Sequence, residues 1–192
     1  MAASQTNGAQ LSGKKVLMIT LRLITAADLD AIVRLQDSCY SDALYESPEL
    51  LSQRLAVAAN SCWLAQNSDG ELLAYLFSYP AQDGYITPLA AAFTPAAKPE
   101  LLYLHDMAVS PKARGLGLAG QLLQNAKQYA LSLGLSKLAL VAVQGSVPYW
   151  QRQGFTVVHN VMAEAKLALA SYQGEQACYM QLPLEKDNNY AA

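Results

Sequence analysis

The sequence predicts one α/β domain with a mixed sheet of about seven strands and helices on both faces. Three observations predict this class. Segments with strand and helix patterns follow one another in the order β-α-α-β-β-β-α-β-α-β-β. The run from Leu101 to Val109 is almost continuously apolar, as in a central strand that is covered on both faces. The 192 residues are 53% hydrophobic and 15% charged, which suits one globular core.

Seven segments have the pattern of strands, because they are alternating or continuous apolar runs bounded by turn residues. They are Val16–Leu23, Cys62–Ala65, Leu72–Tyr79, Leu101–Val109, Leu138–Val143, Phe155–His159 and Ala177–Leu182. Between the second and third lies Asn67-Ser68-Asp69-Gly70, which favours a hairpin turn.

Four segments have the pattern of helices. Thr25 and Ser47 are expected N-caps of the first two. The third carries apolar residues four apart from Leu118 onward and is expected to end near Gly134, a residue typical of the position after a helix. Ser146 is the expected N-cap of a short fourth helix.

Two regions fall outside this pattern. Residues 1–15 are polar, small and without period, and they predict a disordered leader before a single domain at residues 16–192. The segment Ala81–Glu100 contains three prolines among alanines. Long loops inside compact domains are uncommon, so a surface insertion, a lid and a dimer contact all stay open for it.

Composition excludes several function classes. A net charge of −2 argues against a general nucleic-acid binder, which needs a broad basic face. No apolar run is long enough to cross a membrane, and the N-terminus lacks a signal-peptide pattern. The three cysteines and two histidines share no metal-ligand spacing, so we expect no metal site and reduced thiols in a cytoplasmic protein.

The most informative segment is LHDMAVSPKARGLGLAGQLLQNA, residues 104–126. A strand is followed by a basic turn with three glycines and then by an amphipathic helix. Unpaired N–H groups at a helix start favour negative charge, and glycine lets the backbone approach a phosphate closely. Lys112 and Arg114 stand beside these glycines. The segment therefore predicts a pyrophosphate site.

The same glycines also spell the dinucleotide-binding pattern, from Gly115 through Gly117 to Gly120. In that pattern the first glycine follows its strand almost directly, and a carboxylate that binds ribose comes about twenty residues later. Here residues 110–114 intervene, and residues 137–144 contain no carboxylate. The nicotinamide interpretation is therefore the weaker one.

Arg114-x-x-Gly117-x-Ala119 resembles the pyrophosphate signature of the GNAT superfamily of acetyl-CoA-dependent acyltransferases. LYLHDMAVSP resembles the fourth strand of that family, and SVPYWQRQGF resembles its later helix-and-strand motif, which commonly ends in Gly-Phe. The resemblance covers roughly residues 17–184. It implies a mostly antiparallel twisted sheet that splays between the fourth and fifth strands, with acetyl-CoA bound in the gap.

The resemblance also implies residue roles in binding acetyl-CoA. The backbone near the end of the fourth strand would pair with the pantetheine arm, and the amides of the turn would hold the pyrophosphate. Side chains of the turn and of the short fourth helix would line the same site. The implied residues are Met107, Ala108, Val109, Lys112, Arg114, Gly115, Leu116, Gly117, Leu118, Ala119, Gly120, Ser146 and Trp150.

By the same resemblance, His105 matches a strand histidine that serves as the base in arylalkylamine acetyltransferases; a histidine with only a structural role is the alternative. Asp106 is expected on the opposite face by strand alternation, as an acceptor-site carboxylate, a base or a buried structural acid. The family often places a tyrosine acid where this chain has Trp150. Either the adjacent Tyr149 is the acid, or Trp150 only packs against the thioester and water protonates the thiolate.

The acceptor is expected between the first two helices and the late loops. Tyrosines and carboxylates suit a cationic amine. The candidates are Tyr40, Asp42, Tyr45, Glu46, Asp106, Tyr172 and Glu175. We expect direct acetyl transfer to a primary amine of a small or amino-acid-like molecule, by a monomer or homodimer. A protein N-terminus or lysine as acceptor, and a non-catalytic acyl-CoA-binding module, are the alternatives.

Overall fold

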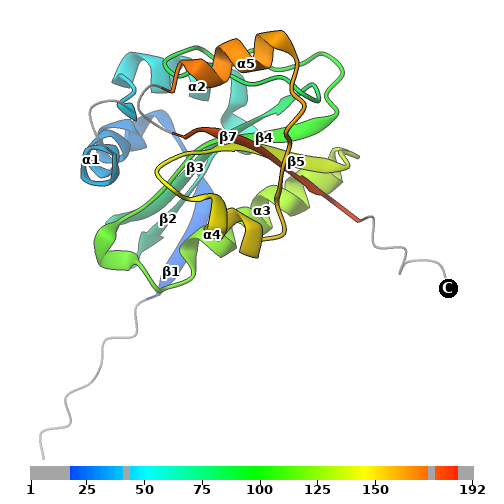
Figure 1. The fold of residues 1–192 in the computed structure, drawn as a ribbon. Helices are drawn as coiled ribbons and strands as arrows, with labels where there is room; N and C mark the ends of the chain where they lie inside the picture. Colours follow the sequence, from blue (N-terminus) through cyan, green and yellow to red (C-terminus); the bar gives the residue numbers. More distant parts are fainter. Residues whose placement is uncertain (1–17, 41–43, 173–175, 186–192) are drawn as a thin grey trace, which may run out of the picture.

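The structure, a computed structural model, describes residues 18–40, 44–172 and 176–185. The expected leader and the first residues of the predicted first strand lie outside this part of the chain, as do Asp42 and Glu175. Within the described residues the chain forms one seven-stranded sheet with helices on both faces (Figure 1). The predicted fold class is confirmed.

The sheet has the strand order β1-β2-β3-β4-β5-β7-β6. Only β4 and β5 run parallel, and the other neighbouring pairs are antiparallel. The strands are β1 (Ile19–Leu23), β2 (Trp63–Asn67), β3 (Leu72–Ala81), β4 (Leu101–Val109), β5 (Lys137–Ala142), β6 (Thr156–Val157) and β7 (Cys178–Pro183). The long β3 and β4 lie at the centre and carry the largest share of the buried residues.

The helices divide the core into two layers. Helices α1 (Leu29–Cys39), α2 (Pro48–Ala58) and α5 (Ala163–Ala170) pack on one face, and α3 (Leu118–Ser132) and α4 (Val147–Arg152) pack on the other (Figure 1). Short 3-10 turns accompany them, among them those at Ala26–Asp28, Ala59–Ser61 and Pro111–Ala113. None of the helices in the described part of the chain is both long and apolar enough to span a bilayer.

Three of the four helix-end signals in the sequence have the expected local structure. The carboxylate of Asp28 accepts hydrogen bonds from the backbone and the hydroxyl of Thr25, each at 2.8 Å. The Ser47 hydroxyl accepts from the backbone N–H of Leu50, the third residue of α2, at 3.3 Å. Gly134 follows α3 in the left-handed conformation. Ser146 occupies the N-cap position of α4, although its side chain makes no capping hydrogen bond.

Two elements differ from the prediction. Helix α5 was missed, because its buried residues are the small Ala165 and Ala168 whereas the larger Leu167 is 75% exposed. Large apolar residues therefore do not mark its buried face. Strand β6 comprises Thr156–Val157 rather than residues 155–159, because only these two residues pair with β7 in the ladder.

The segment 82–100 contains no helix or strand, but it belongs to the core. Ile86, Thr87 and Phe93 are buried, and the Phe93 ring stacks on Tyr79 with ring centroids 4.4 Å apart. Its end is fixed by a hydrogen bond from the Glu100 N–H to the last residue of β3. The segment is therefore anchored in the core by a few buried side chains, while most of its residues stay at least partly exposed.

Candidate active site

The two parallel central strands separate beyond a short paired stretch. Residues Leu102–Leu104 of β4 pair with Leu138–Leu140 of β5, but β4 continues to Val109 and β5 to Ala142. Past Leu104, the edge of β4 that faces β5 therefore has no strand partner. This is the splay that the sequence predicts between the fourth and fifth strands.

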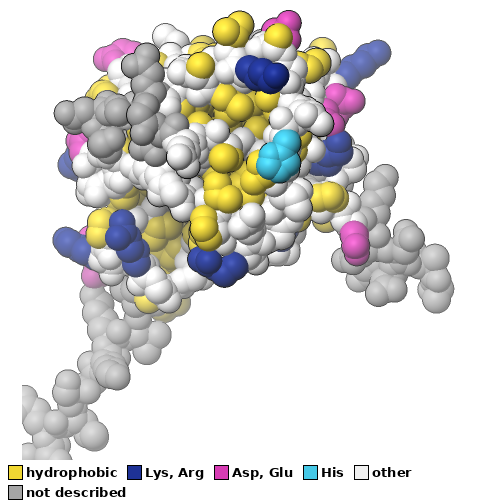
Figure 2. Space-filling model, viewed as in Figure 1, with side chains coloured by type: hydrophobic (Ala, Val, Ile, Leu, Met, Phe, Trp, Pro, Cys, Tyr) yellow, Lys and Arg dark blue, Asp and Glu magenta, His cyan; other side chains and the backbone are white. Residues whose placement is uncertain are grey.

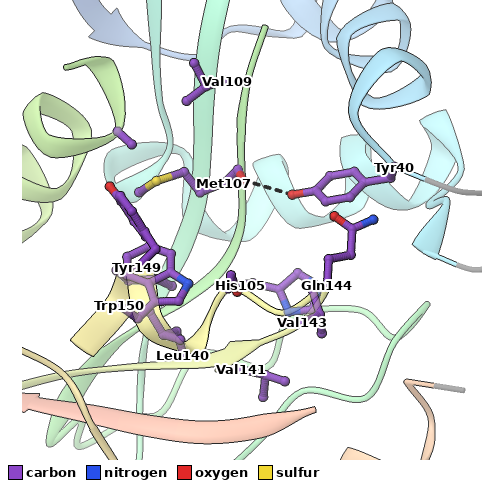
Figure 3. Close-up of a pocket in the computed structure, with 13 residues that line it drawn as sticks. Tyr40, His105, Met107, Val109, Leu140, Val141, Val143, Gln144, Tyr149 and Trp150 are labelled. Atoms are coloured by element: carbon purple, nitrogen blue, oxygen red, sulfur yellow. Dashed lines mark hydrogen bonds between the residues drawn. The ribbon is translucent and has the colours of Figure 1, made fainter. Parts of the chain in front are cut away.

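The backbone of β4 directs two residues toward this open edge. The Ser110 N–H donates to Leu73 of β3 at 2.8 Å, and hydrogen-bonded pairs alternate along an antiparallel ladder. Met107 and Val109 consequently turn their N–H and C=O groups away from β3. The Met107 carbonyl accepts from the Tyr40 hydroxyl at 2.9 Å, as the dashed line in Figure 3 marks.

A bulge in β4 changes the direction of one predicted side chain. Phe77 of β3 pairs with Asp106 and the next residue of β3 pairs with Leu104, so His105 is an extra residue in the ladder. His105 and Asp106 both make their contacts on the side of α1 and α2. The expectation that strand alternation turns Asp106 to the opposite face is therefore wrong.

His105 is held by a carboxylate from the connection between α1 and α2, on the same face of the sheet. Its Nε2 lies 3.2 Å from Oε1 of Glu46, and the side chains are 2% and 3% exposed. Because a carboxylate accepts hydrogen bonds, this contact places the proton of the neutral ring on Nε2. Nδ1 is buried without a partner among the described residues and keeps its lone pair. The Phe93 ring packs edge-on against the imidazole.

Glu46 also forms a buried ion pair with Arg54 of α2. Both terminal nitrogens of Arg54 contact the carboxylate, one of them at 2.7 Å. Arg54 further donates to the Ala91 carbonyl, and the Ala90 N–H donates to Glu46 at 3.2 Å. Burial opposes the charge, but His105 and Arg54 together lower the pKa of Glu46 to about 2. Glu46 is therefore ionised at neutral pH and ties segment 82–100 to His105.

Asp106 is a second buried carboxyl group, bound by two tyrosines. The Tyr40 hydroxyl lies 2.7 Å from one oxygen and the Tyr75 hydroxyl 2.8 Å from the other. Burial and the nearby charge of Glu46 raise its pKa, although the two hydroxyls and His105 act in the opposite direction. Two acidic groups on one sheet face thus have pKa values shifted in opposite directions, a pattern typical of acid–base sites.

A cavity of about 240 Å³ lies along the open edge of β4. In Figure 3, Tyr149 and Trp150 of α4 lie on one side of Met107, and Tyr40 lies on the other. The residues that line this cavity come from the end of α1, both splayed strands, the start of α3, the turn after β5 and α4. They are Tyr40, Leu104, His105, Met107, Val109, Ala119, Leu140, Val141, Val143, Gln144, Ser146, Tyr149 and Trp150.

A second hollow of about 470 Å³ adjoins this cavity, because Val109, Ala119 and Tyr149 line both. The glycine turn forms its other wall, and Arg114 also lines it. Lys112 instead lines a different hollow with residues of α1 and β3. The structure therefore brings Arg114, but not Lys112, to the predicted pyrophosphate position.

The turn itself has the geometry that an anion needs. Gly115 and Gly117 have φ values of +84° and +74°, and a Cβ at either would meet no atom within 4 Å. The first N–H bonded within α3 is that of Gln121, which donates to Gly117 at 3.1 Å. The amides of residues 118–120 therefore have no partner within the helix and begin its positive end.

The remaining candidates are dispersed. Tyr45 is 43% exposed and is not among the residues that line the cavity, and the hydroxyl of the buried Tyr172 donates to the Thr87 carbonyl. Arg54 and Tyr75, which hold the two acidic groups, escaped the sequence analysis. A buried arginine resembles an exposed one in sequence, and Tyr75 resembles any aromatic residue of a strand.

On the face that Figure 2 shows, hydrophobic side chains gather in the middle. The Lys and Arg side chains there lie apart from one another and do not form a band.

Comparison with known proteins agrees with the fold and the site. The profile of the acetyltransferase (GNAT) family matches residues 29–155, about two thirds of the chain. The protein therefore belongs to the GNAT family and is an acyltransferase, and proteins of this family bind acyl-CoA. None of the curated proteins compared with the chain matches it significantly.

Solved structures with the same fold include proteins of different activities. A GNAT-like decarboxylase, GphF, in complex with isobutyryl-CoA is 15% identical, with a TM-score of 0.67 over 86% of this chain and 100% of the other. A putative phosphinothricin N-acetyltransferase is 18% identical, with a TM-score of 0.62 over 88% and 100%. The ribosomal-protein-S18-alanine N-acetyltransferase from Escherichia coli is 14% identical, with a TM-score of 0.61 over 91% and 99%.

Proposed function

We propose that the protein transfers an acetyl group from acetyl-CoA to a primary amine of a small or amino-acid-like molecule. One observation carries this proposal: the open edge of β4, the cavity and the glycine turn form one continuous path. The path begins at Met107 and reaches Arg114 through the second hollow. An extended arm with a pyrophosphate at one end fits a path of this kind.

The chain's own groups support binding of acetyl-CoA along this path. The N–H and C=O groups of Met107 and Val109 would pair with the amides of the arm as an added strand does. The amides of residues 115–120 and the Arg114 guanidinium would hold the pyrophosphate. Trp150 would pack against the thioester, and Ser146 lines the same cavity.

His105 is the proposed base. Its Nδ1 has a free lone pair, and a positive charge formed on the ring would be stabilised by Glu46 at 3.2 Å. The ring takes a proton from the amine directly or through water. A backbone N–H of residues 107–109 would stabilise the oxyanion. For protonation of the thiolate, Tyr149 at the cavity wall and water are the candidates from the sequence.

The tyrosine lining of the cavity supports a cationic amine as acceptor. Tyr40 is the expected acceptor contact within the cavity, whereas Glu46 is already engaged by Arg54. A protein N-terminus or a lysine remains the second candidate, since the same fold occurs in a ribosomal-protein acetyltransferase. The three cysteines, all within the described residues, form no disulfide, as we expect of a cytoplasmic protein. We expect the enzyme to act as a monomer or homodimer.

Binding of CoA is tested with a matched pair of glycine variants. Gly117 and Gly134 have φ values of +74° and +75°, and a Cβ at either meets nothing within 4 Å. Alanine in the left-handed conformation should destabilise both variants by the same amount, about 1–2 kcal/mol. We expect Gly117→Ala to weaken CoA binding in calorimetry at least tenfold and Gly134→Ala to leave it unchanged. Equal affinity in the two variants would contradict the assigned pyrophosphate site.

Turnover is tested by thiol release from acetyl-CoA with phenylethylamine, an alanine-initiated peptide and a lysine-containing peptide. We expect release with the small amine, and about 100-fold less with His105→Ala. Tyr149→Phe reports whether that hydroxyl or water is the acid. CoA binding without thiol release for every amine would favour a non-catalytic acyl-CoA-binding module.

A further inference from the structure

Three short contacts between Tyr75, Asp106, Tyr40 and the Met107 carbonyl fix where protons lie. Tyr75 is 2.8 Å from Asp106, Tyr40 is 2.7 Å from the other oxygen of Asp106, and Tyr40 is also 2.9 Å from the Met107 carbonyl. Each hydroxyl has one hydrogen, and a carbonyl has none. An ionised Asp106 would leave two hydrogens for three contacts.

A protonated Asp106 supplies the missing hydrogen. Its carboxyl O–H then donates to the Tyr40 oxygen, Tyr40 donates to the Met107 carbonyl, and Tyr75 donates to the second carboxyl oxygen. Every contact then has one donor and one acceptor. With an ionised carboxylate, two oxygens 2.9 Å or less apart would face each other without a hydrogen, which a buried site disfavours.

We infer that Asp106 is protonated in the resting enzyme and that Tyr40 passes this proton to the leaving thiolate in the cavity. This role rests on the proposed function, because it needs a thioester along the open edge of β4. It makes Tyr40 a catalytic residue and Asp106 its proton source. Neither the Tyr149 hydroxyl nor a water molecule is then required as the acid.

The surroundings of Asp106 favour the neutral form. The side chain lies in the core, and the negative charge of Glu46 opposes a second one on Asp106. These two effects raise its pKa, in agreement with the hydrogen count. The described groups that act on it come from α1, the start of α2, β3 and β4: Tyr40, Glu46, Tyr75 and His105. The positive charge of Arg54 is already paired with Glu46.

Of the two tyrosines, Tyr40 connects this proton to the reaction. It lines the cavity, whereas Tyr75 is completely buried and does not. When the pantetheine arm donates an N–H to the Met107 carbonyl, that carbonyl no longer needs the Tyr40 hydrogen. The hydroxyl is then available to turn toward the cavity, while its oxygen still accepts from Asp106.

The breakdown of the tetrahedral intermediate moves one proton to sulfur. The C–S bond of the tetrahedral intermediate breaks and its electron pair goes to sulfur, which takes the Tyr40 proton. The Tyr40 oxygen takes the proton of Asp106, which becomes a carboxylate. The amine nitrogen has lost its own proton to His105. After CoA leaves, water reprotonates Asp106 and accepts the proton from His105.

The protonation of Asp106 is tested without turnover, by infrared spectroscopy of the full chain. We expect a carboxylic-acid C=O band at neutral pH in the difference between the wild-type protein and Asp106→Asn. An asparagine keeps a donor toward Tyr40 and an acceptor toward Tyr75, so the melting temperature of this variant should be unchanged. The absence of the band in the wild-type protein would overturn the inference, whether or not the protein acetylates amines.

The proton transfer is tested with a matched tyrosine pair, using acetyl-CoA and the fastest amine of the panel. Tyr40→Phe and Tyr75→Phe each remove one hydrogen bond to Asp106, but only Tyr40 faces the cavity. We expect Tyr40→Phe to lower kcat about 100-fold with little change in the KM for acetyl-CoA, and Tyr75→Phe to lower it much less. The alkaline limb of the kcat–pH profile should disappear in Tyr40→Phe. Equal losses of kcat in the two variants would refute the role of Tyr40.

Discussion

Replacing Glu46 by glutamine removes the charge that joins Arg54 to His105. The pKa of Glu46 falls from 4.5 to about 2 on folding. At about 1.4 kcal/mol per pKa unit, this shift corresponds to about 3 kcal/mol of folding stability at neutral pH. This value agrees with the cost of removing one partner of a buried ion pair, which is typically about 3–5 kcal/mol. We therefore expect Glu46→Gln to lose about 3 kcal/mol.

The pH dependence gives the sign of the effect. A carboxylate whose pKa is lowered on folding stabilises the protein above its unfolded pKa of 4.5 and loses this contribution as the pH falls toward 2. Urea unfolding near pH 7 and near pH 3 should therefore show a large difference between wild type and Glu46→Gln at neutral pH and a smaller one in acid. The exposed Glu49 at the start of α2 provides the control, since Glu49→Gln should change stability by less than about 0.5 kcal/mol.

Two results would refute this reasoning. A loss below about 1 kcal/mol at neutral pH would mean that the Arg54 charge is compensated elsewhere. A difference that does not change with pH would mean that the loss comes from packing and not from the charge. Replacing the pair together, with Glu46→Leu and Arg54→Met, should recover most of the stability that the single variant loses.

Three further predictions concern stability and reactivity. Ser47→Ala removes the N-cap of α2 and should cost about 1 kcal/mol in urea unfolding; an unchanged midpoint would show that the cap is dispensable. Burial raises the pKa of Cys62 to about 12, so this thiol should react with a disulfide reagent only after unfolding, and rapid native labelling would contradict its burial. Gly154→Ala should cost more than Gly70→Ala, because both have positive φ but only the first Cβ meets Leu182, at 3.2 Å; equal melting temperatures would refute this.

Local signals in the sequence were sufficient for most elements. Caps such as Ser47 and the turn around Gly117 depend on neighbouring residues alone, and they occur where the pattern predicts them. The alternation rule failed at Asp106, because a bulge is a property of how β4 pairs with β3 and leaves no mark in either strand by itself. Helix α5 escaped because alanines form its buried face, so its apolar residues show no helical period.

The site was predictable only in part, for a similar reason. The glycine turn and His105 belong to one contiguous segment, so their proximity follows from the chain. The partners of His105 and Asp106 come from α1, α2 and β3, and their proximity follows from tertiary packing. A buried ion pair such as that between Glu46 and Arg54 cannot be separated in sequence from two exposed charges.

Segment 82–100 is fastened to the Glu46–Arg54 pair by two main-chain groups, the Ala90 N–H and the Ala91 carbonyl, and by the Phe93 ring, whose centroid lies 4.8 Å from the Arg54 guanidinium carbon. Side chains at positions 90 and 91 make neither hydrogen bond, but the φ of +59° at position 90 excludes proline, which also has no N–H, and disfavours β-branched residues there. The path of this segment and its buried Phe93 are constrained, whereas the exposed side chains around Phe93 are free to vary. A library of sequences between Pro88 and Pro95 that keeps Phe93 would thus change the surface near His105 while leaving its carboxylate support in place.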